Sequence, residues 1–463
     1  MRKPLPKFSP PELKKEDFTC LKSESRAFEC ELITHLFGGG VEAGQIDKDM
    51  PIRATTIRGQ LRFWWRIAYK KKYSANLFKA EMDLWGGSDD MGTLTASKVL
   101  VRVSLNSRDI PINKDKIERC AEYKKKSDGN FKSFPENWVG GAEAGGYSLF
   151  PGKGKVLNGV IEKHPSDLLK PGIKWNLMIT FSDDSIGQEG IDEVVTAIKW
   201  WATFGSVGSR GRRGLGAITV KAVGPTEENK ATNPDSKSPL IRLQKKEVSE
   251  AGYKMVIQNR KKTHKNAADA WKDGIKALHT FRQGLNFARN SAPNSKPGRS
   301  FWPEPDAIRK ITACSADKHK PIEPVKEFFP RACFGLPIIF QFKDKDQGDP
   351  ENTTLKPENA ERMASPIIIR PYSLDDYGTE WACSALYLGT ELPKIKIKVD
   401  MKNNNIEKPV NYFPNDNVLI NKLMDSIKPL QAVRVKLENT DFPDPIQVFL
   451  EFFEDPSRFL ENQ

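Results

Sequence analysis

Residues 53–72 read RATTIRGQLRFWWRIAYKKK, a stretch that holds basic and aromatic residues but no acid. Its spacing favours a helix over residues 56–72. On such a helix, residues four positions apart lie on one stripe that drifts by about 40° per step. Leu61 and Ala68 are left to face a core. The basic stripe consists of Arg58, Arg62, Arg66 and Lys70.

This stripe is unfavourable for an isolated helix. Like charges at positions i and i+4 destabilise a helix by roughly 0.2–0.5 kcal/mol per pair. No acid between Arg53 and Lys72 offsets the three pairs of the stripe. A polyanion would remove this cost, so Arg53, the stripe and the adjacent Trp65 are candidate nucleic-acid contacts. The alternative is a solvated basic face whose tryptophans pack inward, and at least one of Trp64 and Trp65 is expected in the core.

A second basic cluster, residues 205–216, reads GSVGSRGRRGLG. Its five glycines allow tight backbone turns with accessible N–H groups, and its three arginines add charge and planar donors. Backbone N–H groups and arginines of this kind bind phosphates. The alternative interpretation of the segment is a plain hairpin turn. The cluster has neither the Walker A nor the GxGxxG spacing, so nucleotide hydrolysis is not supported. The candidate contacts are Gly208, Arg210, Gly211, Arg212 and Arg213.

The elements around these clusters predict an α+β fold. Strands and helices are expected in the order strand, helix, strand, strand, helix, strand, which is the split βαβ, or ferredoxin-like, arrangement that also forms the core of RNA-recognition folds. The strands are expected at residues 28–33, 98–103, 175–181 and 217–220, and the helices at 56–72 and 192–204. Residues 120–160 show no clear period and are expected to be an irregular insertion.

The second half has weaker signals and is expected to be a diverged domain of the same class. A helix is expected at 267–287 and a polar, exposed hairpin or insertion at 343–358. Strands are expected at 338–342, 367–369, 395–399 and 432–437. The expected organisation is an arm at 1–26, a first domain at 27–223, a linker at 224–239 and a second domain at 240–463.

Composition agrees with a polyanionic partner but is not specific. Lysine and arginine outnumber aspartate and glutamate by 73 to 60, giving a net charge of +13. No run approaches the roughly 18–20 apolar residues that span a bilayer, and residues 1–7 lack the apolar segment of a secretory signal. Six scattered cysteines without a CxxC pair indicate reduced thiols in a cytoplasmic protein and no zinc site.

Together these clusters resemble a known family. Residues 53–66 resemble the N-terminal signature of the first RAMP subunit of the Cmr complex, the type III-B CRISPR effector. Residues 34–40, THLFGGG, resemble its strand-to-glycine-loop segment, with His35 where proline is more usual. Residues 205–216 resemble the glycine-rich loop of RAMP proteins. In the second half, two segments resemble the paired signatures of that subunit's C-terminal RAMP domain: FGLP at 334–337 and RMASP at 362–366.

The resemblance implies two ferredoxin-like (RRM-like, βαββαβ) RAMP domains with large insertions. It implies a non-catalytic RNA-binding subunit in antiviral defence, without cofactor or metal, at the head of a ribonucleoprotein. There it would lie near the 3′ end of the CRISPR RNA (crRNA) and the 5′ part of the target RNA. Its partners would be both RNAs and the other Cmr subunits, with target cleavage assigned to the backbone subunit.

Two other functions stay open. The first is a RAMP-type endoribonuclease that processes CRISPR precursor RNA, for which His35 beside the glycines is the only candidate catalytic residue. The second is a purely architectural subunit without RNA contact. The remaining histidines show no motif with a base or metal partner, and Asp89 and Asp90 are expected to face water. The other histidines are His164, His264, His279 and His319.

Overall fold

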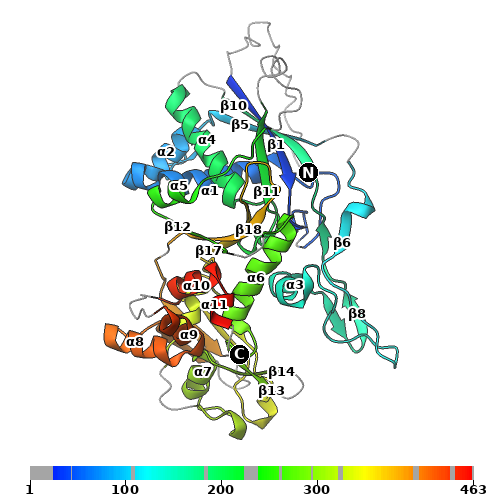
Figure 1. Cartoon of the computed structure of the whole chain (residues 1–463), viewed down its shortest axis with the longest axis vertical. Helices are drawn as coiled ribbons and strands as arrows, with labels where there is room; N and C mark the ends of the chain where they lie inside the picture. Colours follow the sequence, from blue (N-terminus) through cyan, green and yellow to red (C-terminus); the bar gives the residue numbers. More distant parts are fainter. Residues whose placement is uncertain are drawn as a thin grey trace, which may run out of the picture.

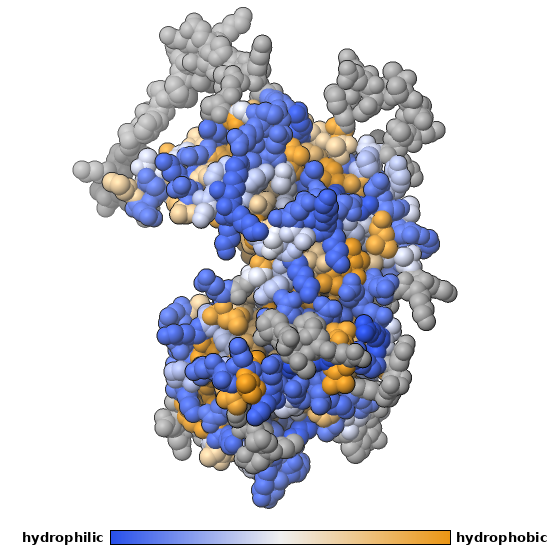
Figure 2. Space-filling model, turned by 60° about the vertical axis from the view of Figure 1, so that its left-hand side comes forward, coloured by the Kyte–Doolittle hydropathy of each residue, from blue (hydrophilic) through white to orange (hydrophobic). Residues whose placement is uncertain are grey.

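The computed structural model of the chain describes residues 24–460, except 43, 106–109, 182–185, 224–237, 260–262, 293–295, 322–326, 390, 400–405 and 438–443. Most of the expected arm and linker therefore lie outside the described residues. The molecule is elongated, with its two main sheets one above the other along the long axis (Figure 1). Figure 2 shows a face with many hydrophilic residues and a hollow between the upper and lower parts.

The first half contains the six elements predicted from sequence. Its sheet has the strand order β11-β1-β10-β5, and each neighbouring pair is antiparallel. This order is the split βαβ arrangement, with α1 and the shorter helix at 77–85 in the first crossover and α4 in the second. The elements are β1 (Glu24–Leu32), α1 (Ala54–Tyr73), β5 (Val99–Leu105), β10 (Lys174–Phe181), α4 (Gly187–Phe204) and β11 (Ile218–Val223).

The helices α1 and α4 pack on one another. Ile57, Leu61, Trp64 and Trp65 are the buried residues of α1, at the spacing that places them on one face. Trp64 stacks on Trp200 of α4, with ring centroids 6.0 Å apart. Two helices flank this pair in the upper part of Figure 1: α2 (Leu77–Trp85) and α5 (Lys245–Glu250).

The second sheet repeats part of the first. Its antiparallel strands have the order β12-β18-β17, and α6 follows β12 along the chain. In the described residues no fourth strand joins this sheet, and α10 packs against α6 and β12 instead. The elements are β12 (Lys254–Ile257), α6 (Ala267–Gln283), β17 (Ile367–Ser373), β18 (Trp381–Tyr387) and α10 (Pro445–Glu454).

Both faces of the second sheet are buried, which joins the two halves into four layers. Ile368 and Leu386 pack with the α1 and α4 layer, whereas Ile367 and Ala385 pack with α6 and α10. Side chains alternate between the faces of a strand, so β17 is apolar and buried along its whole length. The order of layers is therefore first sheet, α1 and α4, second sheet, then α6 and α10 (Figure 1).

A separate four-stranded sheet corrects the expectation for residues 343–358. That segment was expected to be exposed, but Thr353, Leu355 and Pro357 are buried because β16 lies between two other strands. The sheet has the order β15-β16-β19-β20. Its strands are β15 (Ile338–Phe340), β16 (Thr353–Pro357), β19 (Ile395–Val399) and β20 (Ile406–Val410).

The strand expected at 432–437 is wrong, because these residues lie mostly in a helix. Val433 and Val435 mimic strand alternation, but the buried residues Leu430, Val433 and Arg434 have helical spacing. Pro429 stands at the start of the helix, where proline is well tolerated. The helices of this part are α7 (Glu304–Thr312), α8 (Asn417–Ser426), α9 (Lys428–Lys436) and α11 (Ser457–Leu460).

The insertion near 120–160 is more regular than expected. It contains α3 (Gly141–Ser148), which packs on α6, and a hairpin of β7 (Lys155–Leu157) and β8 (Val160–Lys163). Its glycines hid this order, since Gly in a helix lowers the helical signal. The other short strands are β2 (Leu36–Phe37), β3 (Gly87–Ser88), β4 (Leu94–Thr95), β6 (Ile117–Arg119), β9 (Asp167–Leu169), β13 (Arg289–Ala292) and β14 (Lys296–Ser300).

Two compositional expectations can be compared with the described residues. None of their helices combines the length and apolarity required to cross a membrane. The cysteines among these residues form no disulfide, and Cys314 alone among them is not fully buried. The buried ones are Cys30, Cys120, Cys333 and Cys383.

Candidate nucleic-acid interface

The glycine loop, residues 205–216, connects α4 to β11 and is held by main-chain hydrogen bonds. The Val207 amide donates to the Gly216 carbonyl at 2.9 Å, which closes the loop on itself. The Ser209 amide donates to the Phe37 carbonyl at 2.8 Å, and the Gly216 amide donates to the His35 carbonyl at 2.8 Å. The two glycine-rich segments singled out in the sequence, 34–40 and 205–216, are therefore neighbours.

Two glycines of this loop are required by its geometry. Gly208 has φ +75°, and a β-carbon there would lie 2.9 Å from the Phe37 carbonyl oxygen. At Gly211 a β-carbon would lie 1.9 Å from the Oγ of Ser206. Side chains are excluded at both positions, so the main chain itself is presented at the loop surface.

A pocket of about 220 Å³ lies where the loop meets α1. The guanidinium of Arg212 lies over the ring of Phe63, 6.0 Å from its centroid. The same guanidinium donates to the Ser365 carbonyl, which fixes it at the pocket wall. The pocket is lined by Gln60, Phe63, Trp64, Phe204, Ser206, Gly208, Gly211, Arg212 and Ile368. The structure thus brings part of the predicted helix and part of the predicted loop together.

The arginines of the α1 stripe are paired within the protein. Glu81 of α2 is only 3% exposed and accepts hydrogen bonds from Arg62 at 2.7 Å and Arg66 at 2.5 Å. Arg58 donates to the Trp85 carbonyl, and Arg53 pairs with Asp47 at 3.1 Å. Acids outside residues 53–72 therefore offset the positive charge of the stripe. Sequence spacing could not show this, since α2 folds back onto α1.

The remaining predicted contacts of α1 divide between core and surface. Trp65 as an RNA contact is wrong, because its side chain is fully buried and its Nε1 donates to Glu193 at 2.9 Å. Lys70 is exposed. Lys72 pairs with Glu189 and Glu193, at 2.6 Å each. Basic residues in the last turn also suit the negative end of the helix dipole.

Arg210 contacts α3 and the main chain of Arg213 contacts α6, and the Arg213 guanidinium also lies 3.4 Å from the Oγ of Ser365. Arg210 has φ +66° and donates from Nε to the Ser148 carbonyl at 3.0 Å. Burial lowers the pKa of Arg213 to about 10, and neighbouring arginines add to the shift. The Trp271 indole of α6 donates to the Arg213 carbonyl at 2.7 Å. Arg212 is thus the loop arginine at the pocket.

Arg370 is a structural residue of this region that the sequence did not reveal. It lies on β17, and its guanidinium donates to the carbonyls of Gly205 at 2.6 Å, Trp201 at 3.1 Å and Ile218. Burial lowers its pKa to about 9. The sequence signal that could have indicated a buried arginine is its position directly after the apolar run Ile367–Ile369. Arg370 fixes both ends of the glycine loop to the second sheet.

The two signature segments of the second half also meet. The Leu336 amide donates to the Met363 carbonyl at 2.9 Å, so FGLP and RMASP lie side by side. Ser365 of the second segment accepts from Arg212 through its carbonyl, and Arg213 reaches its Oγ at 3.4 Å. The signatures of both halves therefore converge on the glycine loop.

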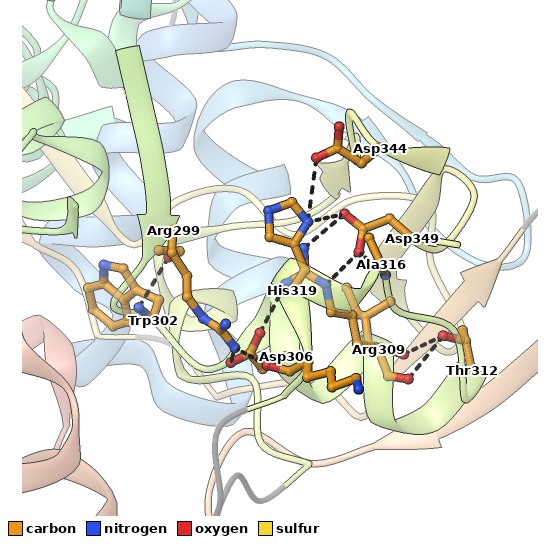
Figure 3. Close-up of polar contacts among 12 residues, drawn as sticks. Arg299, Trp302, Asp306, Arg309, Thr312, Ala316, His319, Asp344 and Asp349 are labelled. Atoms are coloured by element: carbon orange, nitrogen blue, oxygen red, sulfur yellow. Dashed lines mark hydrogen bonds and ion pairs between the residues drawn. The ribbon is translucent and has the colours of Figure 1, made fainter. Parts of the chain in front are cut away.

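Three of the histidines have carboxylate partners, contrary to the sequence expectation. His35 Nε2 lies 2.7 Å from Glu118, and His264 Nε2 lies 2.6 Å from Asp273. His319 Nδ1 lies 2.7 Å from Asp349 and 3.5 Å from Asp344 (Figure 3). All four partners are distant in sequence or not at a recognised motif spacing. Burial lowers the pKa of His35, although Glu118 opposes the shift.

The group in Figure 3 is the one set of possible metal ligands among the described residues. Its carboxylate Asp349 is already bonded by Arg309, at 2.9 and 3.2 Å, and by the Ala316 amide at 3.2 Å. Lys318 pairs with Asp344 at 3.2 Å. These bonds account for the acids as a local ion-pair network. Asp90 is exposed, as expected, whereas Asp89 is half-buried and caps a turn by accepting from the Met91 and Thr93 amides.

Comparison with known proteins gives a family match in the first half. Residues 29–219 match the model of the RAMP superfamily. The matched region contains α1, β5, β10, α4 and the glycine loop, together with the last part of β1 and the first two residues of β11. The pocket is therefore built mainly from this matched region, with Ile368 supplied by the second half.

The chain is also similar to two solved structures. One is the crystal structure of Cmr1 from Pyrococcus furiosus in its apo form, with TM-score 0.37 and 14% identity over 83% of this chain and 94% of that chain. The other is a chain of the cryo-EM structure of the type III-B Cmr-beta bound to cognate target RNA. It has TM-score 0.37 and 12% identity over 87% of this chain and 100% of that chain. No curated protein matches the chain.

Proposed function

We propose that this chain is a non-catalytic RNA-binding subunit of a type III-B CRISPR (Cmr) effector complex. The observation that carries the proposal is the pocket at which α1 and the glycine loop of the RAMP domain meet, with Arg212 over Phe63. Residues of both signature-like segments, 53–66 and 205–216, line this pocket. Their convergence supports a ligand that both segments bind.

The pocket has the groups that bind single-stranded RNA. The ring of Phe63 offers a partly exposed aromatic face, and stacking of a base on such a face contributes roughly 1–3 kcal/mol. Arg212 adds a guanidinium over this ring, and Gly208 and Gly211 bring main chain without a side chain of its own to the pocket wall. Gln60 adds an amide that can donate and accept hydrogen bonds.

The proposed place in the complex follows the sequence resemblance. The chain would consist of two ferredoxin-like RAMP domains, at residues 27–223 and 240–463, joined by the linker at 224–239. It would act in the cytoplasm at the head of the complex, near the crRNA 3′ end and the 5′ part of the target RNA. Cleavage would belong to other subunits, and sequence specificity would come from guide–target pairing.

The second candidate function is cleavage of CRISPR precursor RNA. It is favoured by one observation, the contact of His35 Nε2 with Glu118 at 2.7 Å beside the glycine loop. A histidine with a carboxylate partner can exchange a proton with a substrate. Incubation of labelled precursor with the chain tests this candidate. Specific cleavage that His35→Ala abolishes would replace the binding-subunit proposal.

RNA binding is tested by filter binding of single-stranded RNA to the full chain. Arg212→Gln and Phe63→Leu should each weaken binding by about tenfold, since one stacked base or charged contact is worth on the order of 1.4 kcal/mol or more. Arg26→Gln, on the exposed part of β1, is the matched control and should bind as the wild type does. Unchanged affinity of both pocket variants would remove the pocket from the RNA site.

A further inference from the structure

A chain of arginines runs from the glycine loop to Arg282 at the end of α6 and Arg289 at the start of β13. We call it the arginine seam. Arg282 of α6 donates to the Tyr147 hydroxyl at 2.8 Å, and Arg210 donates to the Ser148 carbonyl, so α3 borders the seam. The seam comprises Arg210, Arg213, Arg282, Arg289 and Arg331.

These arginines are close enough to affect one another. The pKa of Arg213 is lowered first by burial and then, among other charges, by those of Arg282 and Arg210. The pKa of Arg331 is lowered by burial, and the charge of Arg282 adds to this. The pKa of Arg289 is likewise lowered by burial and by the charge of Arg331. The positive charge is therefore continuous from the loop to β13.

The seam has too few acids to balance it. Glu304, which is fully buried, pairs with Arg331 at 3.0 Å. Within the described ranges, Arg210, Arg213, Arg282 and Arg289 form no ion pair with a carboxylate. Desolvated cations without a counter-charge destabilise a fold unless an anion or further hydrogen bonds compensate them.

The seam also has unused donors. The Nε atoms of Arg282 and Arg289 are buried and have no hydrogen-bond partner among the described residues. Burial raises the pKa of the Tyr147 hydroxyl, but the charges of Arg282 and Arg213 outweigh burial and hold it below its ordinary value. Arg282, Arg289 and Tyr147 are partly exposed as residues, so a ligand can reach atoms of these side chains other than the two buried Nε atoms. Planar guanidinium groups suit the oxygens of a phosphate.

We propose that the arginine seam binds a phosphate of the RNA backbone, as a second contact beyond the pocket. This inference rests on the proposed function, because Arg212 at the pocket is followed directly by Arg213 at the seam. RNA that leaves the pocket would cross the glycine loop and meet Arg282. The insertion near 120–160 then has a role: Tyr147 and Ser148 of α3 hold Arg282 and Arg210 in place.

The test is the salt dependence of RNA binding by the full chain. Each neutralised phosphate contributes roughly 0.7 to the slope of log affinity against log salt for single strands. Arg282→Gln should therefore lower the slope by about 0.7, and Arg289→Gln should lower it similarly. Arg282→Lys keeps the charge and should keep the slope. Thermal melting of each variant shows whether it is folded.

Lys276→Gln is the matched control. Lys276 lies on the same helix and pairs with Glu143 of α3 at 3.0 Å, so its loss removes the same charge and loosens the same docking. It should keep the wild-type slope. An equal fall in slope with Lys276→Gln would show that Arg282 acts through α3 docking, which would overturn the phosphate contact.

The remaining outcomes separate the seam from the proposed function. If the wild-type chain does not bind RNA, the proposed function fails and the seam fails with it. If it binds RNA and both Arg282→Gln and Arg289→Gln keep the wild-type slope, the proposed phosphate contact at the arginine seam is wrong, whereas RNA binding at the pocket is unaffected. If inorganic phosphate or polyglutamate stabilises the wild type through Arg282 without a change in the RNA slope, the ligand is a free phosphate or an acidic protein.

Discussion

At Gly211 a β-carbon would lie 1.9 Å from the Oγ of Ser206, so the loop must shift to accept any side chain. Gly211→Ala should lower the free energy of unfolding by about 1–3 kcal/mol, the range for local strain at a constrained backbone position. It should also weaken RNA binding, because the shifted main chain no longer borders the pocket. Urea unfolding and filter binding measure the two effects.

Gly59→Ala is the control for this prediction. Gly59 lies in α1, and a β-carbon there would meet nothing within 4 Å. Alanine should therefore stabilise the chain by about 0.5–1 kcal/mol through helix propensity. If Gly211→Ala were as stable as Gly59→Ala, the close approach of the loop to Ser206 would be incorrect.

His35 gives a residue-scale prediction about pH. Burial lowers its pKa in the folded state, while the unfolded chain has the ordinary value of 6.5. The unfolded state then binds the proton more readily, so stability is complete above pH 6.5 and falls as the pH drops toward the folded pKa. Burial lowers the pKa of His279 as well, in the same direction.

His35→Gln should therefore lose less stability than the wild type when the pH falls from about 7.5 to about 5.5. His164→Gln, at an exposed position, should follow the wild-type curve. Urea unfolding at both pH values measures the difference. A His35→Gln curve parallel to that of the wild type would contradict the burial of this imidazole.

At the scale of elements, α1 depends on α2 for its charge balance. Glu81 is buried against Arg62 and Arg66, which are 26% and 41% exposed. Glu81→Gln should destabilise the chain by about 1–3 kcal/mol, less than the loss of a fully buried pair because solvent reaches both arginines. Guanidinium chloride unfolding measures this loss.

Asp83→Asn is the matched control on α2, because Asp83 is exposed and carries the same charge. Its stability should stay within about 0.5 kcal/mol of the wild type. Equal stabilities of Glu81→Gln and Asp83→Asn would mean that the α1 arginines do not rely on Glu81. They would then be available to RNA, as the sequence alone suggested.

The elements differ in how far the sequence could predict them. The first half was predicted well because apolar alternation and helical spacing are local signals that α1, α4 and β10 all carry. The helix α9 was missed because Val433 and Val435 alternate like a strand while their partners are distant. The burial of Trp65 and the pairing of Arg62 were missed for the same reason: tertiary contacts, not spacing, determine them.

The candidate site shows the same limit. The sequence identified Gly208, Gly211 and Arg212, all of which line the pocket. It did not identify Arg282, because an arginine on an amphipathic helix is ordinary until α3 and the loop are placed beside it. A charge cluster that forms across three elements cannot be recognised from the spacing of residues within any one of them.

At the scale of the whole molecule, Arg370 joins the two halves. It is buried and donates hydrogen bonds to three carbonyls of the first half from its position on β17. Arg370→Met should remove these three hydrogen bonds, although the Trp201 carbonyl keeps its bond from the Gly205 amide. We expect the chain to be destabilised by about 2–4 kcal/mol, a range that already includes the gain from removing a buried charge. Calorimetry should show the single unfolding transition split into two.

Arg362→Met is the control, since Arg362 is exposed on the segment that precedes β17. It should keep one transition at the wild-type temperature. One undivided transition in Arg370→Met, at the wild-type temperature, would mean that the apolar contacts of Ile368 and Leu386 alone couple the four layers.

The central claim, that RNA lies between α1 and the glycine loop, is tested most directly by photo-crosslinking. The full chain is irradiated with single-stranded RNA containing 4-thiouridine, and the cross-linked peptides are mapped by mass spectrometry. Cross-links should fall on the peptides that contain Phe63 and residues 205–216. Cross-links confined to α8 and α9, with none on these two peptides, would contradict the account.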